Sequence, residues 1–202
     1  MTAKPGERRL QILQALAEML EAPHSEKITT AALAARLKCS EAALYRHFAS
    51  KAQMYDGLIE FIEQSLFSII NQITRDETAG LRQIELILGM LLGFAQKNRG
   101  MTRVLIGEAL VNENERLQAR ITALLDKLEA SFKQALRIAS SNASTPPQEQ
   151  IQALANLMRC FVLGRWEQYA RSSFTRDPLA QWPQQWALLQ DACQTTCAPF
   201  QQ

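Results

Sequence analysis

Residues 28–51 read ITTAALAARLKCSEAALYRHFASK and predict two short amphipathic helices joined by a tight turn. Thr29 is suited to cap the first helix, because its hydroxyl can accept a hydrogen bond from an N–H group of the first turn. Ser40 can cap the second helix in the same way. Lys38 and Cys39 form the break between them. The stretch therefore predicts a helix, a turn and a second helix.

The outer face of the second helix carries polar and basic side chains. Such a helix fits the major groove of DNA, where its side chains can hydrogen-bond to base edges and phosphates. Further upstream, Arg8 and Arg9 either reach phosphates or a minor groove, or are the solvated start of the first helix. The residues that we predict to contact DNA are Arg8, Arg9, Thr29, Thr30, Ser40, Glu41, Ala42, Ala43, Tyr45, Arg46, His47 and Lys51.

The pattern TTAxLAxxLxxSEAALYRHFxSK resembles the DNA-binding domain of TetR-type regulators. Tyr45, His47, Phe48 and Lys51 carry the resemblance best. The family usually has glycine in the turn, where this chain has Lys38. Because a non-glycine residue is strained in a left-handed conformation, we expect the turn to be wound differently here.

Helical spacing of apolar residues continues through the rest of the chain, and it predicts an all-α fold of about nine helices. We expect a helix-turn-helix domain over residues 1–52 and a larger helical domain over residues 53–202. The first helix is predicted over residues 5–21 and a connector helix over residues 51–75. The inward face predicted for the first helix is Leu10, Leu13, Leu16, Ala17 and Leu20. Further helices are predicted over residues 78–98, 101–111, 113–139, 148–173 and 183–196.

The charge of the chain is concentrated in the predicted reading segment. The net charge of +2 is too small to indicate nucleic-acid binding by itself. Residues 27–51, however, hold five basic residues and one acidic residue, a local charge of +4. The start of the chain does not resemble a signal peptide, and the apolar run at residues 86–95 is too short to span a bilayer. We therefore expect a cytoplasmic, nucleoid-associated protein without a membrane role.

Catalytic and metal-binding motifs are missing from the sequence. It has two histidines, His24 and His47, and no nucleophile elbow, glycine-rich phosphate loop or metal-ligand spacing. We expect no enzyme activity, no cofactor and no metal. The four cysteines, expected to be free thiols, are Cys39, Cys160, Cys193 and Cys197.

A single reading helix contacts one half-site, so we expect a homodimer on palindromic double-stranded DNA. The resemblance favours the last two long helices as the dimer seam. Each apolar residue on these helices can equally belong to the core of one chain. The candidate seam residues are Leu154, Leu157, Met158, Phe161, Val162, Trp166, Trp186, Leu189 and Cys193.

The larger domain resembles one branch of the TetR family, the nucleoid occlusion factors. The motifs that carry this resemblance through most of residues 28–138 are SEAALYRHFxSK, LIEFIExSL, LLGFxxxNxGxTRxLxGxAL and ExxRLQxRIxxL. The resemblance implies a dimer that binds palindromic chromosomal sites. It also implies that the DNA-bound dimer binds the C-terminal tail of the tubulin-like division protein FtsZ and opposes ring assembly over the nucleoid.

The resemblance implies a partner site at Phe61, Met90, Gly93, Lys97 and Asn98. Met90, Gly93, Lys97 and Asn98 fall at helical spacing on one side of a helix that is apolar almost all round. Gly93 allows close backbone approach, and Lys97 and Asn98 offer polar anchors for an acidic peptide. Core packing explains Phe61 and Met90 equally well. Lys97 stands where the branch often has arginine, so bidentate carboxylate recognition is lost.

The alternative is a ligand-responsive TetR-type repressor with an inducer pocket in its body. The central apolar residues look sufficient to fill a core, but the sequence leaves a pocket open. If the chain is a nucleoid occlusion factor, we expect its DNA binding and its binding of the FtsZ tail to be coupled through the connector helix.

Overall fold

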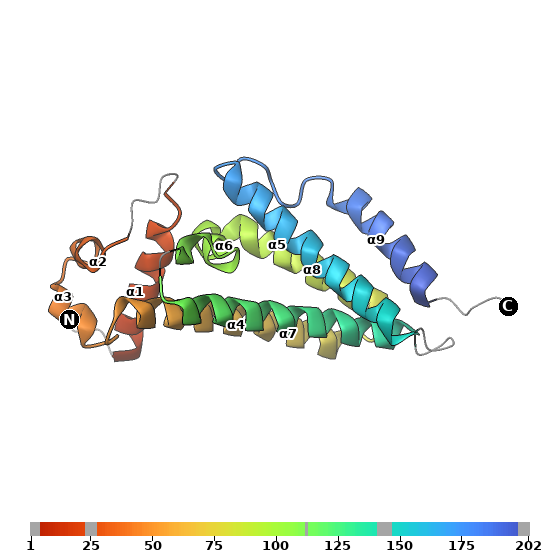
Figure 1. Ribbon diagram of the computed structural model, residues 1–202, viewed down its shortest axis with the longest axis horizontal. Coiled ribbons are helices and arrows are strands. Elements are labelled where there is room, and N and C mark those ends of the chain that lie inside the picture. Colours follow the sequence, from red (N-terminus) through yellow and green to blue (C-terminus); the bar gives the residue numbers. More distant parts are fainter. Residues whose placement is uncertain (1–4, 23–27, 112, 141–146, 198–202) are drawn as a thin grey trace. The chain divides into compact units, whose positions relative to one another are not determined.

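The computed structural model describes residues 5–22, 28–111, 113–140 and 147–197, and all regular structure within these ranges is helical (Figure 1). The bounds of the helices are α1 Pro5–Met19, α2 Thr30–Arg36, α3 Glu41–Tyr45, α4 Lys51–Asp76, α5 Gly80–Lys97, α6 Arg99–Leu105, η1 Glu108–Leu110, α7 Glu115–Ser140, α8 Gln148–Arg171 and α9 Trp182–Cys197. The described residues thus form nine α-helices and one short 3₁₀ helix, η1, so the all-α prediction is confirmed.

The predicted helix bounds need small corrections. The first helix ends at Met19 rather than residue 21. The single short helix predicted over residues 101–111 is two elements, because Gly107 adopts φ 78° between α6 and η1. Such a conformation ends a helix readily only at glycine.

The chain divides into two compact units. One consists of Met1–Gln64 and Asn98–Thr122, and the other of Ser65–Lys97 and Ala123–Gln202. We refer to them as the first and the second unit. The functional division between residues 52 and 53 remains a prediction.

The first unit is built around α1, which packs against α2 and α6. Leu13, Leu16, Ala17 and Leu20 are buried, as predicted. Leu10 was also predicted to face inward, and this prediction is wrong, because Leu10 is 39% exposed.

Gly100 sets how closely α1 and α6 approach each other. A Cβ atom at Gly100 would lie 1.8 Å from the Ala17 carbonyl oxygen, so no other residue fits there. Close by, the buried Arg103 donates from Nη1 to the Ala22 carbonyl oxygen at 2.7 Å. The start of α6 is therefore tied to the end of α1.

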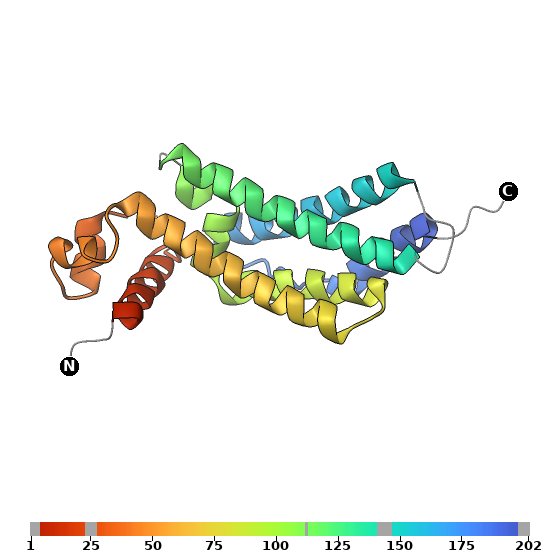
Figure 2. The same ribbon diagram turned by 90° about the horizontal axis from the view of Figure 1, so that it is seen from below.

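The second unit has a core between α5, α8 and α9, which pack on one another. Helices α5 and α8 run alongside each other in Figures 1 and 2. The fully buried Trp166 donates from Nε1 to the Leu91 carbonyl oxygen at 3.0 Å, so the indole polar group is satisfied within the core. Gly80 lets α5 approach the end of α7, since a Cβ there would lie 2.2 Å from the Ala135 carbonyl oxygen.

A buried carboxylate joins α7 to α8 in the second unit. Glu129 pairs with Lys133 at 2.8 Å and with Arg159 at 3.2 Å. It also accepts hydrogen bonds from the amides of Gln152 at 2.9 Å and Asn156 at 3.2 Å. The hydrogen bond from Lys133 is the main reason that the pKa of Glu129 falls from 4.5 to about 2, against the opposing effect of burial. The charged form of Glu129 is therefore strongly preferred in the folded chain.

Two features of the described residues bear on other functions. None of the helices that the structure describes is both long enough and apolar enough to cross a bilayer. Within the same residues, no group of three histidine, cysteine or acidic side chains is arranged to hold a metal ion. Cys39 and Cys160 are free thiols and Cys193 is buried, whereas His24 and the side chain of Cys197 lie outside the described part.

Candidate nucleic-acid interface and partner surface

The two helices predicted from residues 28–51 are α2 and α3, and each begins with the predicted cap. The Thr29 hydroxyl accepts from the Ala32 N–H at 3.1 Å, and the Ser40 hydroxyl accepts from the Ala43 N–H at 3.2 Å. Each cap satisfies one N–H group that has no partner inside the helix, and is worth about 1 kcal/mol. The fully buried Leu44 fixes the inner face of α3.

The turn between α2 and α3 has a left-handed residue that is not glycine. Lys38 adopts φ 50°, and its N–H donates to the Ala35 carbonyl at 3.1 Å. The Cys39 N–H donates to the Ala34 carbonyl at 3.0 Å, which completes a Schellman motif. The turn is therefore wound as a glycine turn would be, contrary to our expectation, because these two bonds hold Lys38 in the unfavourable conformation.

The exposed face of α3 and its C-terminal cap carry the predicted reading side chains. Tyr45 is 44% exposed, and Ala42 and Arg46 are exposed as well. The Thr30 hydroxyl donates to the Glu41 carboxylate, and the Tyr45 hydroxyl lies 3.5 Å from the Thr30 oxygen. These contacts join the starts of α2 and α3 on one surface, so the structure brings this group of predicted residues together.

Other predicted DNA contacts have partners within the first unit that the sequence did not reveal. Arg9 donates from Nη1 to the His47 carbonyl oxygen at 3.1 Å and lies 4.1 Å from the centre of the Phe48 ring. Arg8 donates to the Leu37 carbonyl oxygen at 3.4 Å. Both arginines therefore connect α1 to the helix pair α2 and α3, which carries the predicted DNA contacts.

Lys51, at the start of α4, forms an ion pair with Glu113 and lies 5.5 Å from the centre of the Tyr55 ring. Burial raises the pKa of Tyr55 to about 12, and the Glu113 carboxylate adds to the rise. Tyr55 therefore stays neutral at physiological pH. A DNA phosphate that binds Lys51 has to compete with Glu113 for its ammonium group.

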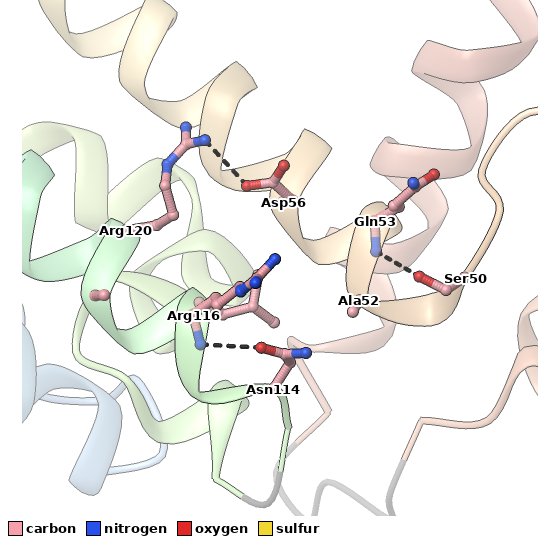
Figure 3. Close-up of a pocket in the computed structure, with 9 residues that line it drawn as sticks. Ser50, Ala52, Gln53, Asp56, Asn114, Arg116 and Arg120 are labelled. Carbon is pink, nitrogen blue, oxygen red and sulfur yellow. Dashed lines mark hydrogen bonds and ion pairs between the residues drawn. The ribbon is translucent and has the colours of Figure 1, made fainter.

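A cleft of about 610 Å³ lies in the first unit between the starts of α4 and α7 (Figure 3). Arg116 and Arg120 line it from α7, and Ser50, Gln53 and Asp56 line it from the α4 side. Arg120 pairs with Asp56 at 3.1 Å, so its charge is already compensated. The volume lies in the range of small-molecule sites, but the lining combines charged groups with small alanines.

The residues of the predicted partner site are divided between the two units. Met90 and Gly93 are partly exposed on α5 in the second unit, and Lys97 is exposed at its end. Phe61, on α4, and Asn98, the N-cap of α6, are partly exposed in the first unit. Core packing therefore does not fully bury Phe61 or Met90.

The end of α5 that carries Lys97 is held firmly within the second unit. The Gln96 amide donates to the Asp177 carboxylate at 3.0 Å, and the Tyr169 hydroxyl donates to the Gln96 carbonyl at 3.3 Å. Gly93 has open space where a Cβ would stand, with no atom of the described chain within 4 Å outside its own local helix. Nothing inside the described chain therefore requires glycine at this position.

The candidate seam residues separate into core and surface. Within the single chain, the buried ones are Leu154, Met158, Val162, Trp166, Trp186, Leu189 and Cys193. For these seven, the core interpretation is correct. Leu157 on α8 is 50% exposed, and Leu188 on α9, which we did not single out, is 72% exposed. The sequence alone could not show which large apolar side chains of α8 and α9 stay exposed.

Comparisons of sequence cover almost the whole chain. Residues 12–58 match the model of bacterial regulatory proteins of the tetR family, and residues 78–194 match an SlmA-like, tetracyclin repressor-like C-terminal domain. The chain is 47% identical over 189 residues to a nucleoid occlusion factor SlmA of Marinomonas sp., covering 94% of this chain and 96% of the relative. It is 50% identical over 184 residues to a protein of the same name from Alteromonas mediterranea, covering 91% and 94%.

Solved structures support the fold. A TetR transcription regulator from Haloarcula marismortui aligns with TM-score 0.77 and 15% identity, covering 93% of this chain and 98% of that one. The regulator FadR from Bacillus subtilis, solved with stearoyl-CoA, aligns with TM-score 0.74 and 12% identity, covering 91% and 98%. The regulators of this family are DNA-binding proteins and not enzymes. The chain belongs to the TetR family of bacterial regulatory proteins, and its C-terminal domain is of the SlmA-like type.

Proposed function

We propose that the protein is a nucleoid occlusion factor. It binds palindromic chromosomal sites as a homodimer, and in the DNA-bound form it binds the C-terminal tail of FtsZ and inhibits division-ring assembly over the nucleoid. The observation that carries the proposal is identity of 47–50% along more than nine-tenths of the chain to proteins named nucleoid occlusion factor SlmA. The capped helix pair with its exposed tyrosine and arginine supports the DNA-binding half of the proposal.

DNA binding depends on the exposed face of α3 and its cap. Arg46 supplies a phosphate contact, and Tyr45 and His47 read or position the duplex. The test is selection of genomic fragments by the purified protein, followed by sequencing. Recovery of a shared palindrome supports the proposal. Recovery of fragments without a common sequence, by a protein that is folded and dimeric, contradicts sequence-specific binding.

The dimer places one reading helix in each half-site. The exposed Leu157 and Leu188 supply apolar area for a seam formed by α8 and α9 across a twofold axis. Leu188→Asp is expected to shift the protein to monomer in sedimentation experiments. The exposed Gln194 of the same helix provides the matched control, since Gln194→Asp adds the same charge without removing apolar area. An unchanged dimer in both variants contradicts this seam.

The FtsZ tail binds at Phe61, Met90, Gly93, Lys97 and Asn98. The exposed Lys97 supplies a positive charge for an acidic residue of the tail, and Gly93 lets the peptide backbone approach α5. Lysine makes a point-charge contact rather than the bidentate contact of arginine. We therefore expect Lys97→Arg to tighten tail binding and Lys97→Glu to abolish it, with Lys127→Glu on α7 as the charge-reversal control.

The protein acts at the nucleoid in the cytoplasm, where its DNA sites are. A fluorescent fusion is expected to follow the nucleoid and to become diffuse when Arg46→Ala weakens DNA binding. A wild-type fusion that is spread evenly through the cell contradicts the proposal.

The second candidate is a ligand-responsive repressor, and the 610 Å³ cleft is the observation that favours it. FadR from Bacillus subtilis, which shares the fold at 12% identity, was solved with stearoyl-CoA. Titration of the protein–DNA complex with stearoyl-CoA separates the two functions. Release of DNA by the ligand supports the repressor, whereas unchanged DNA affinity together with tail binding supports the division inhibitor.

A further inference from the structure

The cleft of about 610 Å³ between the starts of α4 and α7 has a polar lining that the division-inhibitor function does not use (Figure 3). All of its described lining residues belong to the first unit. The polar ones are Ser50, Gln53, Asp56, Asn114, Arg116 and Arg120, and the apolar ones are Ala52, Leu117 and Ala119. The volume is sufficient for a small molecule with a polar head group and a short apolar part.

The uncharged polar side chains of the lining have their acceptor oxygens occupied by backbone N–H groups. The Ser50 hydroxyl oxygen accepts from the Gln53 N–H at 3.2 Å, and the Gln53 amide oxygen accepts from the Ala49 N–H at 2.8 Å. The Asn114 amide oxygen accepts from the Arg116 N–H at 3.0 Å. None of the described residues accepts a hydrogen bond from the hydroxyl or amide N–H groups of these three side chains. Their remaining hydrogen-bonding capacity is therefore that of donors.

One positive charge of the lining is uncompensated. Arg116 is exposed, and its guanidinium group forms no ion pair or hydrogen bond with a described residue. Arg120, in contrast, pairs with Asp56 at 3.1 Å and with Glu63 at 3.5 Å. Asp56, the one carboxylate among the described lining residues, is therefore already paired. The charge that is left for a ligand is that of Arg116.

The donors face one another across the cleft. Figure 3 shows the Asn114 nitrogen and the Arg116 guanidinium group extending from α7 toward the α4 side, where Ser50 stands. Helices α4 and α7 also both begin here, so the positive ends of two helix dipoles add to the potential of Arg116. Such a set of groups suits a negatively charged ligand group with several acceptor oxygens, which is a phosphate or a carboxylate.

We propose that this cleft binds a small anionic molecule through its phosphate or carboxylate group. Arg116 forms charge-assisted hydrogen bonds with the anion, and Asn114 and Ser50 donate further hydrogen bonds to it. The side chains of Ala52 and Leu117 contact the uncharged part of the ligand. The inference goes beyond the proposed function, because it holds whether or not the protein binds the FtsZ tail.

A bound anion links the starts of α4 and α7. The ion pair of Lys51 with Glu113 already joins these two helix starts. Ser50 and Asn114 are the direct sequence neighbours of the two paired residues, so a ligand held by both adds a second connection beside the ion pair. Because the unfolded chain lacks this arrangement, the ligand is expected to raise the melting temperature of the protein.

The test is calorimetric titration of the full-length protein with pyrophosphate and, separately, with citrate, in chloride buffer of constant ionic strength. We expect saturable binding of one anion per chain. Arg116→Gln is expected to weaken it at least tenfold, because charge-assisted hydrogen bonds are lost. Arg137→Gln, which removes an exposed arginine farther along α7, is the matched control and should bind as the wild type does. Binding of pyrophosphate alone assigns the site to phosphates, and binding of citrate alone assigns it to carboxylates.

Asn114→Asp tests the amide donor without removing the helix cap. Aspartate caps a helix as well as asparagine does, so the melting temperature of the free protein should not change. The new carboxylate has an acceptor in place of the amide donor, and anion binding should be lost. Gln134→Glu, at an exposed position of α7 outside the cleft, adds the same charge and should leave binding unchanged.

The DNA-binding face is the competing location for an anion, and Arg46→Gln separates it from the cleft. Under our proposal this variant binds the anion as the wild type does. Loss of binding in Arg46→Gln, or unchanged binding in both Arg116→Gln and Asn114→Asp, overturns the site. Absence of saturable binding of either anion by the folded wild type also overturns it. None of these variants changes a residue of the proposed FtsZ site, so these outcomes leave the proposed function standing.

Discussion

Replacing Gly93 with alanine is expected to make the protein more stable and to weaken its binding to the partner tail. Gly93 lies inside α5, where glycine is less favourable than alanine by about 1 kcal/mol. Outside its own local helix, an added Cβ would meet no described atom within 4 Å, so no steric cost offsets this gain. For a chain of this size, 1 kcal/mol corresponds to about 2–4 °C in melting temperature.

Under the proposed function, the bound peptide explains why a destabilising glycine occupies this position. If a peptide backbone lies against Gly93, a methyl group there displaces it, and we expect tail affinity to fall about tenfold, or 1.4 kcal/mol. Calorimetry gives the melting temperature, and peptide anisotropy gives the affinity. DNA affinity is expected to stay unchanged, because α2 and α3, which carry the predicted DNA contacts, belong to the other unit.

Gly89 provides the matched control one turn earlier in the same helix. Its Cβ would lie 3.5 Å from the Trp182 ring, an ordinary contact, so Gly89→Ala should gain similar stability. It should not change tail binding. A Gly93→Ala variant that melts below the wild type refutes the steric argument, and one that binds the tail with unchanged affinity refutes the assignment of Gly93 to the partner site.

Three further changes test the DNA interface and the packing inside each unit. Arg46→Ala should weaken DNA binding at every sequence and lower the slope of log affinity against log salt by about 1, whereas an unchanged slope excludes a phosphate contact. Glu129→Gln should lower the free energy of unfolding, measured with urea at pH 7, by about 3–5 kcal/mol. Because the folded pKa of Glu129 lies near 2 and its ordinary value is 4.5, the wild type should lose this stabilisation as the pH falls from about 5 to 2, and the glutamine variant should not. Gly100→Ala should destabilise by more than about 3 kcal/mol, since its Cβ would overlap the Ala17 carbonyl, and a folded variant with wild-type stability contradicts the packing of α1 on α6.

Local features of α2, α3 and their caps could be predicted from the sequence. The caps at Thr29 and Ser40 depend on residues three positions apart, and the inner position of Leu44 depends on helical periodicity. Both signals lie within one helix turn of the residue concerned. The expectation for the turn at Lys38 was wrong, because two hydrogen bonds of the turn outweigh the intrinsic preference of lysine.

Contacts between distant residues could not be predicted. Lys51 and Glu113 are far apart in sequence, and neither residue type indicates which of many opposite charges is its partner. Leu10 belongs to the apolar stripe of α1, and only the tertiary packing leaves it at the rim of a groove. Periodicity likewise marked both core and surface residues of α8 as apolar, and it could not separate the buried Met158 from the exposed Leu157.

The central claim is that DNA-bound protein recognises the FtsZ tail, and peptide anisotropy with and without the palindromic site tests it most directly. We predict saturable binding that tightens when DNA is present and is lost in Lys97→Glu. Absence of peptide binding by a dimer that holds its DNA tightly would contradict the division-inhibitor account.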